Sequence, residues 1–151
     1  MSIPEQEYEF LMFYMKETWE EMRHTEQLRA TVSSLIMTLA ALVGGFIVQQ
    51  KFTKGTLILS IFLILLGLFG AIMVRKLYQL HQGDQARLNQ WYAYLQEKMP
   101  EAEVIKRRDL GDRVHKDDFF LMSKIPHNYF WMAFHLLIAL EGVVMLLLII
   151  T

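Results

Sequence analysis

The chain has 151 residues, 54 % of them hydrophobic, and a mean hydropathy of +0.25, which is too apolar for an ordinary soluble domain. These values exclude a one-domain cytosolic enzyme, and they exclude a disordered chain, which would lack the Leu, Ile and Phe found here. Fifteen basic and sixteen acidic residues give a net charge of −1, so the overall charge predicts no partner. The absence of cysteine excludes disulfides, Cys-ligated zinc, thiol catalysis and iron–sulfur clusters.

Residues 1–29 are predicted to form a cytoplasmic amphipathic helix. Apolar side chains recur along it at helical spacing: Tyr8, Leu11, Met12, Met15, Trp19 and Met22. Its start carries Glu5, Glu7 and Glu9 without any Lys or Arg, which is unlike the basic start of a cleavable signal peptide. Because neither Pro nor Gly interrupts residues 5–43, we expect this helix to continue into the first apolar segment.

Three apolar segments are each long enough to cross a bilayer: residues 30–50, 55–74 and 129–150. The first two carry no charge, and the third carries a single acid. About 20 residues of helix span the hydrocarbon core, and only a helix satisfies its own backbone hydrogen bonds in lipid. Residues 51–54 are left as the turn between the first two transmembrane helices.

The distribution of Lys and Arg predicts the orientation of these spans. Thirteen of the fifteen basic residues lie in segments 1–29 and 75–128, and the other two are Lys51 and Lys54. By the positive-inside rule, the N-terminus and segment 75–128 are cytoplasmic, and the 51–54 turn and the C-terminus are outside.

The segment 75–128 is predicted to be a cytoplasmic helix followed by a connection. A second apolar stripe runs along the helix and ends before Pro100: Leu77, Leu80, Leu88, Trp91, Tyr92 and Leu95. The short turn makes the two long helices an antiparallel hairpin, and a turn centred at 52–53 places Tyr14 near Trp91 and Phe10 near Leu95. The predicted fold is an all-α membrane protein with three transmembrane helices and a long helical hairpin that extends into the cytoplasm.

Small residues four apart occur in the first two spans, where they permit close contact between helices. The pairs are Ala40 with Gly44, Ala41 with Gly45, and Gly67 with Ala71. We expect them to pack the hairpin within one chain; the alternatives are contacts between chains, or chance.

Glu141 is the most informative residue, because it is the one charged residue in the three apolar segments. An acid at the bilayer midplane costs about 2.5–3.5 kcal/mol, so it is expected to face protein or water. One interpretation is a pore or gate position in an oligomer. The other is a protonated carboxyl that is hydrogen-bonded to Ser33, Thr38 or Ser60. His135 is a second pore or gate candidate, and its alternative is a structural histidine.

A basic cluster in the cytoplasmic connection is the candidate ligand-binding site: Lys106, Arg107, Arg108, Arg113 and Lys116. Consecutive basic residues can hold the phosphates of an anionic membrane lipid or of an oligonucleotide. The alternative is that these residues only anchor the topology of the chain. Neighbouring Asp109, Asp112, Asp117 and Asp118 dilute the charge, which disfavours a long nucleic acid.

The sequence contains no P-loop, no Gly-x-Ser-x-Gly and no HExxH motif, so we do not expect an enzyme. One Glu-x-x-His spacing, Glu21 with His24, is found in di-metal helical bundles, and His81 and Asp84 lie at a similar height on the partner helix. A solvated charged face explains these residues better. No metal and no cofactor are predicted.

The three-span architecture, the acidic amphipathic N-terminus and the run from His24 to Thr31 (HTEQLRAT) resemble the membrane effectors of bacterial nucleotide-signalling anti-phage defence, in particular the Hailong-type effectors. The resemblance implies a homo-oligomer in the bacterial inner membrane, with a tetramer favoured and the C-terminus periplasmic. It implies that a partner nucleotidyltransferase makes a nucleotide or oligodeoxynucleotide signal, which opens an ion path and causes depolarisation and growth arrest. It also implies that the acidic N-terminus, with Glu5, Glu7 and Glu9, forms part of the closed-state block.

Two function hypotheses follow from these observations. The first is an oligomeric ion channel that a cytoplasmic nucleotide or oligonucleotide signal opens. The second is a non-conducting membrane scaffold that docks a cytoplasmic partner protein on its helical stem.

Overall fold

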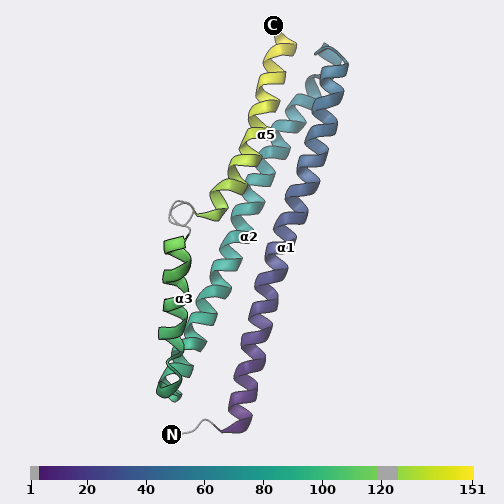
Figure 1. Cartoon of the computed structure of the whole chain (residues 1–151). Coiled ribbons are helices and arrows are strands. Elements are labelled where there is room, and N and C mark those ends of the chain that lie inside the picture. The colour runs from purple at the N-terminus through teal and green to yellow at the C-terminus, as the bar shows by residue number, and fades with distance from the viewer. Residues whose placement is uncertain (1–3, 119–125) are drawn as a thin grey trace. The chain divides into compact units, whose positions relative to one another are not determined.

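The computed structural model describes residues 4–118 and 126–151, and every regular element in these ranges is helical (Figure 1). The helices are α1 (Glu5–Gln49), α2 (Leu57–Lys98), α3 (Val104–Asp118) and α5 (His127–Ile150), with short 3₁₀ turns at Lys54–Thr56 and Pro100–Ala102. Within the described residues, three helices are long and apolar enough to cross a membrane, and they lie in α1, α2 and α5. The prediction of an all-α membrane protein is confirmed.

The chain divides into two compact units, and α1 and α2 contribute to both. The polar unit consists of Met1–Glu26 and Gln79–Pro126. The span unit consists of Gln27–Tyr78 and His127–Thr151. No Pro or Gly interrupts α1 before Gly44, so the amphipathic segment and the first apolar segment form one helix of 45 residues, as predicted.

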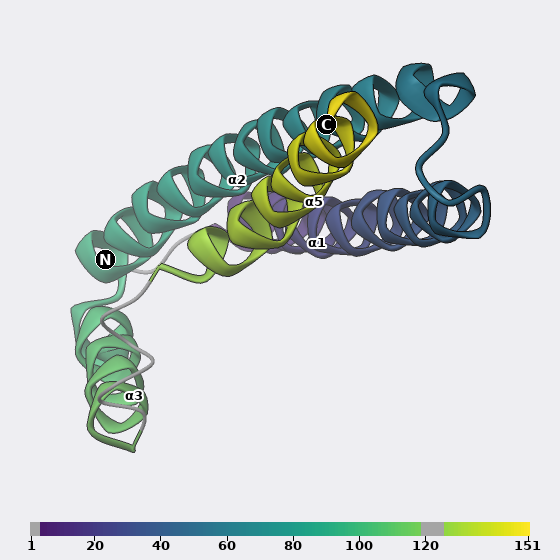
Figure 2. The same ribbon diagram turned by 90° about the horizontal axis from the view of Figure 1, so that it is seen from above.

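In the span unit, α5 packs against both helices of the hairpin (Figure 2). It runs parallel to α1, because Ser33 contacts His135 and Gly44 faces Met145. It runs antiparallel to α2, because Gly70 faces His135 while Gly142 faces Ile64. The core of this unit takes side chains from all three helices: Ile36, Ala40, Ile47, Leu63, Ile138, Met145 and Ile149.

Glycines permit the close approach of α5. A Cβ atom on Gly67 would lie 2.5 Å from the backbone nitrogen of Ala139, and one on Gly142 would lie 2.8 Å from the backbone nitrogen of Ile64. The prediction that small residues pack within one chain is right for Gly44 and Gly67, but the partner helix is α5 rather than the other arm of the hairpin. Gly45 has no atom within 4 Å of the position where a Cβ would be, so it does not pack in the single chain.

The turn that closes the hairpin is a Schellman motif built without glycine. The amide of Phe52 donates to the carbonyl of Ile47, and the amide of Lys51 donates to the carbonyl of Val48. Lys51 and Phe52 have φ values of 52° and 55°, a left-handed conformation that is costly for residues with a Cβ atom. The Phe52 side chain packs against the core cluster that contains Ile47, and this contact fixes the reversal of the chain.

In the polar unit, the α1–α2 hairpin has its own small core of Leu11, Met15, Met22, Leu88 and Leu95. The predicted register is confirmed at Tyr14 and Trp91, whose ring centroids are 6.0 Å apart. Residues 104–118, which include the predicted basic cluster, form helix α3 rather than an irregular connection. Glu103, with φ 48°, reverses the chain, and the Gln96 side chain accepts a hydrogen bond from the amide of Ile105 at 3.2 Å. This bond caps α3 from a residue nine positions away.

Candidate functional site

Glu141 lies on α5 in the third candidate span, and its side chain is exposed in the single chain. A Cβ atom built on Gly44 would lie 2.7 Å from its Oε1 atom, so the carboxyl group lies across the gap left by that glycine on α1. Among the described residues, no side chain makes a hydrogen bond or an ion pair with Glu141. The carboxyl group of Glu141 therefore lacks a side-chain partner among the residues that the structure describes.

None of the three hydroxyl groups considered as partners of Glu141 is hydrogen-bonded to it in the described residues. Ser33 Oγ lies 3.0 Å from Nε2 of His135, and Thr38 Oγ1 donates to the carbonyl of Ser34 at 2.9 Å. Ser60 Oγ is buried and has no hydrogen-bond partner. The alternative of a carboxyl group satisfied by a neighbouring hydroxyl is absent from the single chain.

His135 is enclosed by the three helices of the span unit and has 0 % exposed surface. One ring nitrogen contacts Ser33, and the ring lies flat against Gly70, where a Cβ atom would fall 2.7 Å from its Cγ. Its Nδ1 atom is buried without a hydrogen-bond partner. This is the arrangement expected of a structural histidine, because the ring lies in the interior of the single chain.

Sequence reasoning missed Arg29, which sits directly before the first uncharged run and is 2 % exposed. Its guanidinium lies 5.5 Å from the ring centroid of Trp131, which belongs to the same unit. The available signal was an Arg at the edge of one span together with a Trp at the edge of another, a cation–π combination that is typical of such sites.

The structure separates the five basic residues of the candidate ligand site. Lys106 is paired with Glu103 at 2.8 Å, and Arg108 contacts Asp109 at 2.9 Å and Asn89 at 2.9 Å. The side chains of Arg107 and Arg113 make no hydrogen bond or ion pair within the described part of the chain. The side chain of Lys116 lies outside the described residues.

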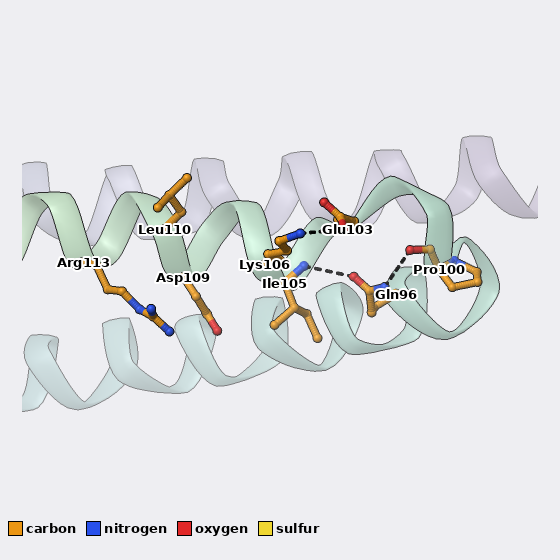
Figure 3. Close-up of a pocket in the computed structure, with 8 residues that line it drawn as sticks. All are labelled: Gln96, Pro100, Glu103, Ile105, Lys106, Asp109, Leu110 and Arg113. Atoms are coloured by element: carbon orange, nitrogen blue, oxygen red, sulfur yellow. Dashed lines mark hydrogen bonds and ion pairs between the residues drawn. The ribbon is translucent and has the colours of Figure 1, made fainter.

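Figure 3 shows the open pocket of about 650 Å³ beside α3, which Lys106 and Arg113 both line. Glu103 and Asp109 line the same pocket, so its two positive charges are balanced by two negative ones. The pocket of a single chain is therefore nearly neutral in net charge. Of the cluster residues whose side chains the structure describes, Arg107 and Arg113 have no ionic partner.

The three N-terminal acids are in different environments. Glu5 and Glu9 are exposed, whereas Glu7 is half-buried and accepts a hydrogen bond from the hydroxyl group of Tyr94 on α2. This hydrogen bond, together with burial, raises the pKa of Tyr94 above its usual value of 10.0. Glu7 thus fixes the start of α1 to the far end of α2.

Comparison with models of protein families, with characterised proteins and with solved structures finds no match. Within the part of the chain that the structure describes, no group of three or more His, Asp or Glu side chains is arranged to hold a metal ion. Glu26 lies 3.4 Å from His81, and Asp84 is paired with Arg87 at 2.8 Å, so both candidate partners of the Glu-x-x-His spacing lie against other side chains.

Proposed function

We propose that the protein is a homo-oligomeric membrane effector that forms an ion-conducting path, opened by an anionic ligand that its polar unit binds. The observation that carries this proposal is the exposed, unpartnered carboxyl group of Glu141 in an otherwise apolar span. Contact with lipid would cost about 2.5–3.5 kcal/mol at the midplane. Assembly around a shared aqueous path removes that cost, because the carboxyl groups of several copies then face water.

The remaining surface of the span unit is suited to lipid and to neighbouring copies. Large apolar side chains are strongly exposed on each of its helices, among them Leu42 at 66 %, Ile58 at 72 % and Leu137 at 59 %. Glu141 is the one acidic residue in the described part of this unit, so it distinguishes one side of the unit from the others. That side, which includes Gly44 and Glu141, is the one we assign to the interior of the oligomer.

The ligand in this proposal is a nucleotide or a short oligodeoxynucleotide from a partner nucleotidyltransferase, as the resemblance to anti-phage effectors implies. Arg107 would contact its phosphates. Opening would depolarise a bacterial inner membrane and arrest growth, with the N-terminus in the cytoplasm and the C-terminus in the periplasm. Glu5 and Glu9 would contribute to the closed-state block.

Conductance measurements in liposomes test the proposal. The wild-type protein should release a trapped ion gradient when the signal is added, and Glu141→Gln should change the closed–open balance while the protein still assembles. Leu140→Gln is the matched control, because it adds the same amide at a neighbouring exposed position of α5.

An assembled protein that never conducts would contradict the channel. A cytoplasmic protein captured by the polar unit in that case would favour the scaffold, for which the exposed aromatic residues Phe10 and Phe13 on α1 provide a surface.

A further inference from the structure

The polar unit presents a groove that the single chain leaves open on one side of the hairpin. The groove encloses about 440 Å³ and carries three aromatic rings, those of Phe13 and Tyr14 on α1 and Trp91 on α2. Glu17 and Glu21 also line it, with Arg87 as the cation. Arg87 is already paired with Asp84 at 2.8 Å and lies 3.8 Å from Glu21. Glu17 has no ionic partner among the described residues, so the groove is aromatic with an unpaired acid.

Helix α3 carries an exposed ridge, which consists of Leu110 and Val114 with Arg107 and Arg113 beside them, and its charge is opposite to that of the unpaired acid in the groove. Leu110 is 63 % exposed and Val114 is 53 % exposed, and their spacing of four places them on one face of the helix. Arg107 and Arg113 lie on either side of this apolar line, so the ridge is apolar along its centre and basic at its edges. Neither arginine has an ionic partner within the described residues.

The groove and α3 lie on opposite faces of α2. Arg87 lines the groove, whereas Asn89 receives a hydrogen bond from Arg108 of α3 at 2.9 Å. Residues two apart in a helix point about 200° apart, so these side chains leave α2 in opposite directions. A chain therefore cannot place its own ridge in its own groove while α3 stays packed on α2.

The ridge and the groove stand at the same level along α2. Arg108 contacts Asn89, and Tyr14 contacts Trp91, and these two α2 residues are separated by only about 3 Å along the helix axis. Two complementary surfaces on opposite faces produce a head-to-tail contact between copies. Such contacts close into a ring when the copies are related by rotation without translation. A ridge and a groove at the same position along the α2 axis permit this arrangement.

We propose that α3 of one copy docks in the aromatic groove of the next copy, with Leu110 against Phe13 and Arg113 facing Glu17. The inference deepens the proposed function, because it rests on the chain being a homo-oligomer and assigns the contact that closes it. The docked ridge covers apolar side chains that are now exposed, and it pairs a cation with an anion that are both unpartnered in the single chain.

Disulfide crosslinking of the full chain in membranes tests the contact, because the natural sequence has no cysteine. A chain that carries both Phe13→Cys and Leu110→Cys should form, on oxidation, a ladder of covalent oligomers that ends at the size of the ring. A disulfide requires Cα atoms within about 7 Å, so the ladder reports direct contact. The matched control pairs Leu110→Cys with Lys16→Cys, which lies on α1 outside the groove and should stay monomeric.

Charge reversal adds an independent readout. Arg113→Glu alone and Glu17→Arg alone should each reduce the crosslinked fraction about threefold, the effect expected of an exposed ion pair. The double reversal should restore it.

Three outcomes would overturn the proposal. Oligomers seen by native mass without a Phe13–Leu110 ladder would place the interface elsewhere and leave the proposed channel standing. A disulfide within one chain would show that the ridge folds onto its own groove. Protection of the Leu110→Cys thiol by anionic vesicles, without crosslinking, would identify lipid headgroups as the occupant. Conductance that fails while the ladder forms would contradict the proposed function but not this contact.

Discussion

The span unit and the polar unit are stabilised in different ways, although α1 and α2 contribute to both. The span unit relies on close backbone approach at Gly67 and Gly142 and on one buried polar pair, Ser33 with His135. The polar unit has a small apolar core and ion pairs at its surface, of which Arg87 with Glu21 is exposed to solvent on both sides. In lipid the hydrophobic effect does not favour helix association, so packing must be close; in water a few buried leucines suffice. The comparison teaches that α2 packs on α5 through glycine in the span unit and on α1 through leucine in the polar unit.

A large effect is expected of Gly67→Leu in the span unit. The new side chain would collide with the backbone of Ala139, so α5 must move away, at a cost of about 3 kcal/mol. Thermal unfolding in detergent, followed by circular dichroism, measures the loss. Gly45→Leu is the control, because nothing lies within 4 Å of its Cβ position. Equal stability of the two variants would show that α5 does not pack on α2 as described.

Leu88→Ala is the matching test in the polar unit. Leu88 has 0 % exposed surface in the small core, and its truncation should cost about 2–5 kcal/mol. Hydrogen exchange should accelerate in residues 8–22 and 84–95 while the span unit keeps its protection. Leu80→Ala, at a position that is 50 % exposed, should have little effect. Simultaneous loss of protection in both units would show that they unfold as one.

The three span-forming helices and the hairpin register could be predicted from the sequence, because apolar periodicity and span length are local properties. Tyr14 and Trp91 could be paired because the turn length fixes which residues face each other. The position of α5 could not be predicted, because a helix that is apolar on all sides gives no indication of the face it buries. The partner of Gly67 was therefore assigned to the wrong helix.

The residues of the candidate sites could be chosen from the sequence by their charge. Which of these residues lie close together could not be predicted. Glu141 was identified by its charge alone, and its isolation in the single chain follows from the separate partners of Ser33 and Thr38. The sequence places the basic cluster in the cytoplasmic connection after Pro100, without assigning it to a helix. The spacing of Leu110 and Val114 was the signal for helix α3, and the cap from Gln96 is a tertiary contact that local patterns do not reveal.

A smaller effect is expected from Ser33→Ala. Removal of the hydroxyl group leaves both nitrogens of the buried His135 ring without a partner, which should cost about 1–3 kcal/mol. Ser34→Ala, at the exposed neighbouring position, should be nearly neutral in the same detergent unfolding assay. A neutral Ser33→Ala would mean that water or another subunit satisfies the ring, which would contradict its enclosure within one chain.

The smallest effect concerns the tyrosine at the far end of the polar unit. The hydrogen bond to Glu7 raises the pKa of Tyr94, so the folded chain holds the phenolic proton more tightly than the unfolded chain does. This contribution to stability is therefore fully present below pH 10, and it is lost as the pH rises through the higher pKa of the folded state. Glu7→Ala should lower the pKa of Tyr94 towards 10.0, as measured by NMR titration of ¹³C-labelled tyrosine. Glu5→Ala removes a nearby acid that does not contact Tyr94, and it should leave this titration unchanged. If Glu7→Ala leaves the pKa of Tyr94 where it is in the wild type, the start of α1 is not held on α2. The acidic N-terminus would then be free to move independently of the hairpin.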